Sequence, residues 1–97
     1  MLTNERIKAL EGMGFKRWTK GDYDRLYINA SDLGLSCTYY KTGNIRSAEF
    51  QGFSISNSQA RSFKYAKTFV DVKTGEVYSD IPELKEAAQQ LLKNSAE

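Results

Sequence analysis

Basic and aromatic side chains are interleaved in two neighbouring segments of the chain, residues 16–20 and 24–27. Lysine and arginine can hold phosphates by charge, and aromatic rings can stack on nucleobases, as in proteins that bind single-stranded nucleic acid. The same residue types also anchor protein–protein interfaces. We therefore take these segments as a candidate binding surface. Its members are Lys16, Arg17, Trp18, Lys20, Arg25 and Tyr27.

Two further groups of basic residues extend this candidate surface, one around a predicted turn and one in a predicted helix. Tyrosines lie beside the cations in both groups. A purely structural explanation stays open as well, because Lys and Arg often protect strand edges and a small domain can need Trp18 for its core. The exposure of Trp18 distinguishes the two explanations. The added residues are Tyr40, Lys41, Arg46, Arg61 and Lys64.

The side chains needed for most acid–base and metal chemistry are scarce, because the sequence has no histidine and a single cysteine, Cys37. This excludes Ser-His-Asp and Cys-His mechanisms and zinc sites that use imidazole, and one thiol cannot replace them. No pair of carboxylates has the spacing typical of a glycosidase or a magnesium site. We therefore expect no enzymatic activity, no cofactor and no metal. Cys37 is expected to be a buried, unreactive side chain in a strand.

Charge is distributed unevenly along the 97 residues, whose formal net charge is +2. Residues 1–67 hold eleven Lys and Arg against six Asp and Glu, whereas residues 68–97 hold three against six. Most of the aromatic residues also lie in the first stretch. A net charge this small weighs against a strongly basic nucleic-acid binder, so a protein and a nucleic acid both stay open as partners.

The sequence also bounds the setting of the protein. No apolar run approaches the roughly 18 residues that a membrane span needs, and the N-terminal residues lack the pattern of a signal peptide. One cysteine forms no internal disulfide, so the fold must be stabilised by packing alone, which suits a reducing compartment. We expect a cytoplasmic protein with no membrane association, and its oligomeric state stays open.

Hydrophobic periodicity and turn residues predict the elements that must position these side chains. Thr3 and Ser56 are predicted N-caps of two helices, the second through a capping box with Gln59. Residues 29–34 predict one helical turn. In the last strand before the second helix, Gly52 interrupts the alternation and predicts a β-bulge. The remaining elements are strands at 15–19, 23–28, 35–41, 45–56, 68–72 and 77–78, and a last helix with an apolar stripe at Leu84, Ala87, Ala88, Leu91 and Leu92.

These elements predict a two-layer α+β fold in the order α-β-β-β-β-α-β-β-α. Each strand pair is joined by a turn too short for a crossover, so we expect a largely antiparallel sheet of hairpins with helices packed on one face. The other face of the sheet then stays open to solvent or to a partner. Residues 1–97 are expected to form one domain with a frayed tail over residues 94–97.

Four segments carry a resemblance to known sequences: GFKRWTKG at residues 14–21, DRLYIN at 24–29, LGL at 33–35 and YKTGNI at 40–45. They resemble small uncharacterised proteins of Gram-positive gut bacteria and their phages or integrative elements, over most of the chain from Ile7 to Leu91. The resemblance implies a bacterial cytoplasmic setting on a mobile element. It carries no motif of known chemistry, so it assigns no functional residue.

The sequence therefore predicts a non-enzymatic binding module. A protein-interaction or accessory protein is the preferred interpretation, because protein contacts can use Trp, Tyr and Arg anchors without a large positive charge. A nucleic-acid-binding accessory protein that uses the basic and aromatic surface is the alternative.

Overall fold

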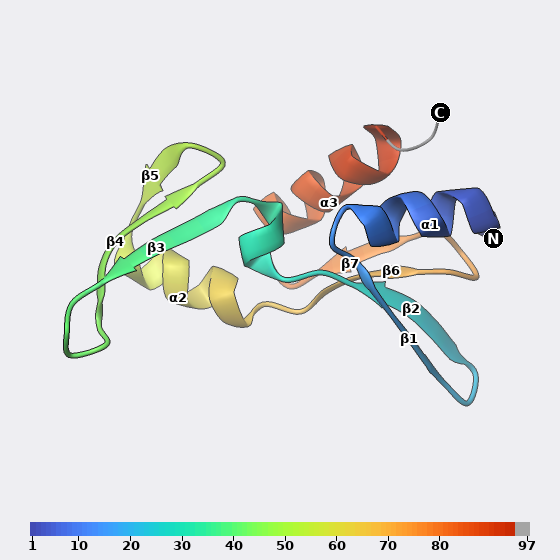
Figure 1. Ribbon diagram of the computed structural model, residues 1–97, viewed down its shortest axis with the longest axis horizontal. Coiled ribbons are helices and arrows are strands. Elements are labelled where there is room, and N and C mark those ends of the chain that lie inside the picture. Colours follow the sequence, from blue (N-terminus) through green and yellow to red (C-terminus); the bar gives the residue numbers. More distant parts are fainter. Residues whose placement is uncertain (95–97) are drawn as a thin grey trace.

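The computed structural model describes residues 1–94, and within them it contains three α-helices, one 3-10 turn and seven strands (Figure 1). In chain order these are α1 (Asn4–Gly12), β1 (Lys16–Lys20), β2 (Tyr23–Tyr27), the 3-10 turn η1 (Ala30–Leu33), β3 (Leu35–Tyr39), β4 (Ile45–Phe50), β5 (Phe53–Ile55), α2 (Asn57–Tyr65), β6 (Thr68–Asp71), β7 (Val77–Ser79) and α3 (Pro82–Asn94).

The strands form two antiparallel sheets, one of four strands in the order β1-β2-β6-β7 and one of three in the order β3-β4-β5. The predicted α+β class with antiparallel hairpins is confirmed. The division into two sheets follows from the pairing of β2 with β6, which places Arg25 opposite Asp71. Everything between these two strands, from η1 to α2, is thereby set apart as a second unit with its own sheet (Figure 1).

The β-bulge predicted at Gly52 is wrong, because Gln51 and Gly52 form a hairpin turn instead. Both have positive φ, 51° and 86°, as a two-residue turn of this kind requires. Phe50 therefore pairs directly with Phe53, and the predicted strand over residues 45–56 becomes β4 and β5. The change in alternation came from a reversal of the chain, which adds one strand to the predicted order.

Local signals at the helix ends are confirmed. The Thr3 hydroxyl accepts a hydrogen bond from the Arg6 backbone N–H at 3.2 Å. At the start of α2 the Ser56 hydroxyl accepts from the Gln59 N–H, and the Gln59 side chain accepts from the Ser56 N–H, both at 3.1 Å. Gly34 ends η1 with φ of 108°, a conformation that favours glycine.

The core lies between the four-stranded sheet and the two helices α1 and α3, which cover the same face of it (Figure 1). Leu10, Leu26, Val70 and Leu84 are fully buried there. Phe63 of α2 joins this cluster and contacts Phe50 edge-on, with ring centroids 5.1 Å apart. Phe50 and Phe63 therefore join the second unit to the main core, and a smaller cluster of Ile45, Ala48 and Ala60 lies within that unit.

The last helix packs with the stripe predicted for it. Ala87 and Ala88 are buried beside Leu84, and Leu91 and Leu92 are half-buried against the core. Asn94 ends α3, and the rest of the predicted frayed tail, residues 95–97, lies outside the described residues. Because α1 and α3 share one face, the other face of the four-stranded sheet is left without a covering helix among residues 1–94.

Candidate binding surfaces

The uncovered face of the four-stranded sheet carries most of its aromatic side chains. Cross-strand partners share a face, and the register pairs Trp18 with Arg25, Tyr27 with Phe69, and Phe69 with Tyr78. Leu26 and Val70 alternate with them and point into the core. We call this surface the aromatic face; its residues are Lys16, Trp18, Lys20, Tyr23, Arg25, Tyr27, Phe69, Asp71 and Tyr78.

Trp18 is exposed, so it is not a core residue, whereas edge protection stays open for Lys16 and Lys20 because β1 is an edge strand of its sheet. The relative exposure of Trp18 is 55%, whereas Phe15 is 3% exposed and supplies the core residue that Trp18 was a candidate for. Tyr23 and Tyr78 are also exposed, at 58% and 42%. Large apolar rings at such exposure do not stabilise the fold by burial, so their clustering needs another explanation.

Arg25 lies at the centre of the aromatic face and is held by rings. Its guanidinium carbon is 4.6 Å from the centroid of Tyr23 and 4.4 Å from that of Phe69, within cation–π range. Phe69 in turn stacks on Tyr78 at 5.0 Å. The Arg25 Nε is buried, lies 3.9 Å from the Asp71 carboxylate, and has no hydrogen-bond partner within residues 1–94. Ring contacts therefore fix the guanidinium, and its hydrogen-bonding capacity is left largely unused.

Tyr78 is fixed at the far edge of the same face. Its hydroxyl donates a hydrogen bond to the Glu76 carboxylate, and this bond raises the pKa of Tyr78 above its ordinary value. The phenol therefore stays neutral, and its ring keeps a set orientation beside Phe69. With Asp71 and Glu76 at this edge, the charges of Lys16, Lys20 and Arg25 are nearly balanced.

Arg17, although it belongs to the predicted surface, lies on the opposite face of β1. It pairs with Asp24 through two hydrogen bonds, from Nε at 2.9 Å and from Nη2 at 2.7 Å. These bonds are the main cause that lowers the pKa of Asp24 and raises that of Arg17. Arg17 therefore serves the β1–β2 hairpin, and its guanidinium is already occupied.

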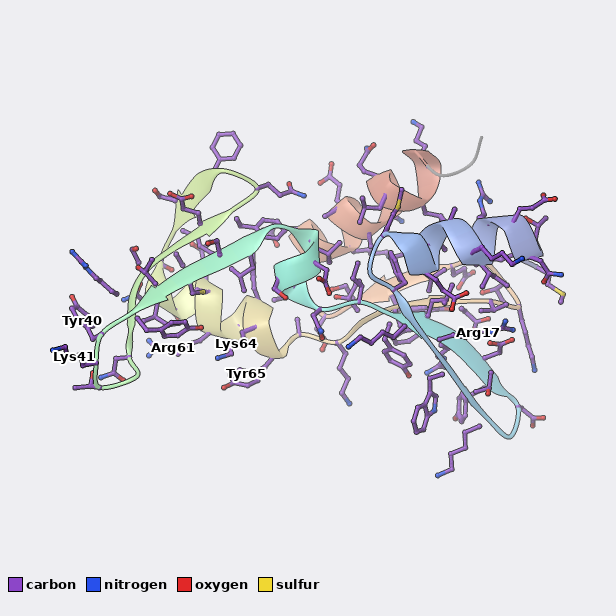
Figure 2. All side chains as sticks on the ribbon, in the orientation of Figure 1. Arg17, Tyr40, Lys41, Arg61, Lys64 and Tyr65 are labelled. Carbon is purple, nitrogen blue, oxygen red and sulfur yellow. The ribbon has the colours of Figure 1, made fainter. Side chains whose placement is uncertain are left out.

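The other predicted cations gather on the unit formed by β3, β4, β5 and α2. Figure 2 shows Tyr40, Lys41, Arg61, Lys64 and Tyr65 following one another along one edge of this unit, with Arg17 toward the other end of the molecule. The molecule is elongated, with principal extents of 43 × 30 × 21 Å. The predicted site residues thus form two separate surfaces. We call the second one the basic surface; its residues are Tyr39, Tyr40, Lys41, Arg61, Lys64 and Tyr65.

Lys64 contacts aromatic rings from two elements of the basic surface. Its Nζ is 5.5 Å from the ring centroid of Tyr39 on β3 and 5.8 Å from that of Tyr65 on α2. Tyr65 is 76% exposed, so the ring that Lys64 contacts is open to solvent. Arg46 falls at a register shift between β3 and β4, and we do not include it in the basic surface.

A hollow of about 340 Å³ adjoins the basic surface between η1, β3 and α2. Cys37 forms part of its wall and is half-buried, which corrects the expectation that this thiol is a buried core residue. The hollow is lined by both apolar and polar residues. Its lining residues are Asn29, Ala30, Ser31, Leu35, Cys37, Tyr39 and Lys64.

Several residues of these surfaces were not candidates from the sequence. Phe69 and Tyr78 reach the aromatic face only through the long-range pairing of β2 with β6, for which the sequence holds no local signal. The sequence predicts Asn29 and Ser31 only as part of a helical turn, and their place in the lining of the hollow depends on how η1 meets β3. Alternation in 68–72 could have placed Phe69 on a face opposite Val70.

A larger hollow of about 620 Å³ lies among residues of α1, β7 and α3. No three side chains of the metal-binding types come together within residues 1–94, and none of the helices there has the length and apolar character needed to cross a membrane. Comparisons with protein-family models, with curated proteins and with solved structures find no match. The function must therefore be inferred from the two surfaces.

Proposed function

We propose that the protein is a non-enzymatic binding module and that it engages a protein partner through the aromatic face. One observation carries this proposal: exposed rings of Trp18, Tyr23 and Tyr78 surround Arg25 on a sheet face that no helix of residues 1–94 covers. Trp, Tyr and Arg are the residue types that contribute most to protein–protein binding energy, and they do so at the centre of an interface.

The charge of the aromatic face favours protein over nucleic acid as its partner. Three cations are nearly balanced by Asp71 and Glu76, so a phosphate chain that crossed the sheet would meet two carboxylates at the β6–β7 edge. Nucleic-acid surfaces gain their affinity from unbalanced positive charge. The nucleic-acid alternative is therefore supported by the basic surface and not by this one.

The chemistry of the face defines the kind of segment that fits it. Apolar side chains can lie against the rings, and a carboxylate of the partner can pair with the charge of Arg25. We infer an extended segment of a partner protein with apolar side chains and a carboxylate. A partner of this kind in a bacterial host or a phage agrees with the resemblance of the sequence to proteins of mobile elements, and a cytoplasmic setting would keep Cys37 reduced.

A display library of short random peptides, selected against the wild-type protein, tests the proposal without knowledge of the partner. Enriched peptides are synthesised with a fluorescent label and titrated by anisotropy against a Trp18→Ala/Tyr23→Ala double variant. We expect at least a tenfold loss of affinity, about 1.4 kcal/mol. Both side chains are exposed, so the variant should fold, and a circular dichroism melt checks this.

The matched control is an Arg61→Ala/Lys64→Ala variant, which changes two exposed residues of the other surface. It should bind the selected peptides within about twofold of the wild type. Peptides that bind the Trp18/Tyr23 variant as tightly as the wild-type protein would contradict the proposal.

A further inference from the structure

The unit from β3 to α2 holds more positive charge than the whole chain. Residues 35–65 contain four Lys and Arg and one acidic residue, Glu49, a net charge of +3, so the remaining residues sum to −1. Both ion pairs within residues 1–94 lie in the four-stranded sheet, and neither involves Lys41, Arg61 or Lys64. These three cations therefore meet solvent without a compensating carboxylate, which is the charge complement of a polyanion.

Exposed aromatic rings lie beside these cations, so a ligand could stack on them. Tyr39, Tyr40 and Tyr65 are all exposed, and Lys64 bridges two of them through contacts of 5.5 and 5.8 Å. A protein that follows a nucleic-acid strand uses cations for the phosphates and rings for the bases. A polyanion with no bases, such as a polyphosphate, would use only the first.

The hollow next to Lys64 has the chemistry of a base site. Its lining combines apolar residues, among them Leu35 and Cys37, with Asn29 and Ser31, whose residue types carry hydrogen-bond donors and acceptors that a base could use. Its volume of about 340 Å³ leaves room for a ring system. A base can enter such a hollow only when it is unstacked, which favours a single strand over a duplex.

We propose that the basic surface and this hollow bind single-stranded nucleic acid. One base lies in the hollow between η1 and β3, its neighbour stacks on Tyr65, and Lys64 and Arg61 hold the phosphates between them. Lys41 and Tyr40 on the β3–β4 turn receive the continuing strand. This site shares no residue with the aromatic face, so the binding of nucleic acid can be tested separately from the binding of a protein partner.

Binding of fluorescein-labelled oligothymidylate and oligouridylate, measured by anisotropy at several salt concentrations, tests the site. We expect salt-sensitive binding whose slope reflects about 0.7 released counterions per phosphate contact. The Arg61→Ala/Lys64→Ala variant should lose at least about tenfold in affinity, and its slope should fall by about 1.4 because two contacts are gone. Tyr65→Ala should also weaken binding, and Tyr65→Phe should restore it, since a phenyl ring still stacks.

A Lys16→Ala/Lys20→Ala variant is the matched control, because it removes the same charge from the other sheet. It should keep oligonucleotide affinity within about twofold. Equal losses in the two double variants would mean that only overall charge matters, and this result would overturn the site. An unchanged affinity in the Arg61/Lys64 variant would overturn it as well.

The single cysteine and the single tryptophan report on the two surfaces separately. Oligouridylate should slow the reaction of Cys37 with a thiol reagent, because the base covers the hollow, and should leave Trp18 emission unchanged. Quenching of Trp18 with no protection of Cys37 would move the nucleic acid to the aromatic face and contradict the inference.

Two further ligands distinguish the sources of the same chemistry. Uridine monophosphate that protects Cys37 as well as the oligomer does would assign a mononucleotide site and overturn binding of a strand. A duplex of the same length that binds as tightly as the single strand would overturn the requirement for an unstacked base.

Discussion

The two sheets of this protein carry similar basic and aromatic residues, but the net charge around these residues differs. In the four-stranded sheet, Arg17 pairs with Asp24 and Arg25 lies beside Asp71, so cations and carboxylates nearly cancel. In the three-stranded unit, Lys64 meets the rings of Tyr39 and Tyr65. Three cations lie among aromatic rings in each region, yet the first surface is nearly neutral and the second is basic. The difference in charge depends on which strands pair, because the pairing of β2 with β6 places Asp71 beside Arg25.

The comparison assumes that both regions belong to one cooperative fold, and Leu84→Ala tests this with the largest expected effect. Leu84 is fully buried in the cluster that Phe50 and Phe63 join from the three-stranded unit. Its truncation should lower the free energy of unfolding by about 2–5 kcal/mol. Urea titrations followed by Trp18 emission and by Cys37 reactivity should give coincident transitions in both proteins.

Two results of this experiment would break the comparison. A loss below about 0.5 kcal/mol would mean that α3 does not dock on the sheet as described. Separate transitions for Trp18 and Cys37 would mean that the two regions unfold independently and share no core.

Gly34→Ala sharpens the comparison at the junction of η1 and β3, inside the second unit. Gly34 has φ of 108°, and a Cβ there would lie 3.0 Å from the Gln51 side chain and 3.3 Å from its backbone nitrogen. We expect a cost of about 1–3 kcal/mol, measured by thermal or urea unfolding. Gly12→Ala is the matched control, because Gly12 lies in α1 with open space at its Cβ position, and it should be neutral or stabilising. Equal effects of the two substitutions would contradict the strained geometry of the junction.

The smallest expected effect concerns the ion pair of the four-stranded sheet. Arg17 holds the pKa of Asp24 below its ordinary value, so the pair stabilises the folded protein above the unfolded pKa of about 4 and this contribution is lost as the pH falls through the lower folded value. Urea unfolding of wild type and Arg17→Ala over this range should show a stability difference that shrinks toward acid. Lys16→Ala serves as control, and a difference independent of pH would show that Arg17 acts through packing alone.

Local structure could be predicted where a few neighbouring residues carry the signal. The capping box of Ser56 and Gln59 and the Gly34 end of η1 satisfy their own backbone groups, so no distant contact is needed to recognise them. The turn at Gly52 was mistaken for a bulge because both interrupt the alternation of a strand. Gln51 has the positive φ that a two-residue turn requires, but glutamine rarely adopts this conformation, so the sequence carried no sign of it.

The candidate site could be predicted only as a list of residues. Trp18, Arg25 and Tyr27 follow from alternation within one hairpin. Their neighbours Phe69 and Tyr78 follow from pairing across more than forty positions of sequence, which composition and periodicity do not encode. The sequence also predicts one surface where the structure has two. It could not show that β2 pairs with β6 and so separates the unit that carries the basic surface.

The most direct test of two independent surfaces is a pair of nuclear magnetic resonance titrations of the same labelled protein, one with a selected peptide and one with oligouridylate. We predict that the peptide shifts amide signals of β1, β2, β6 and β7, and that oligouridylate shifts those of η1, the end of β3 and α2. Shifts from both ligands in the same strands would contradict the division of function between the two sheets.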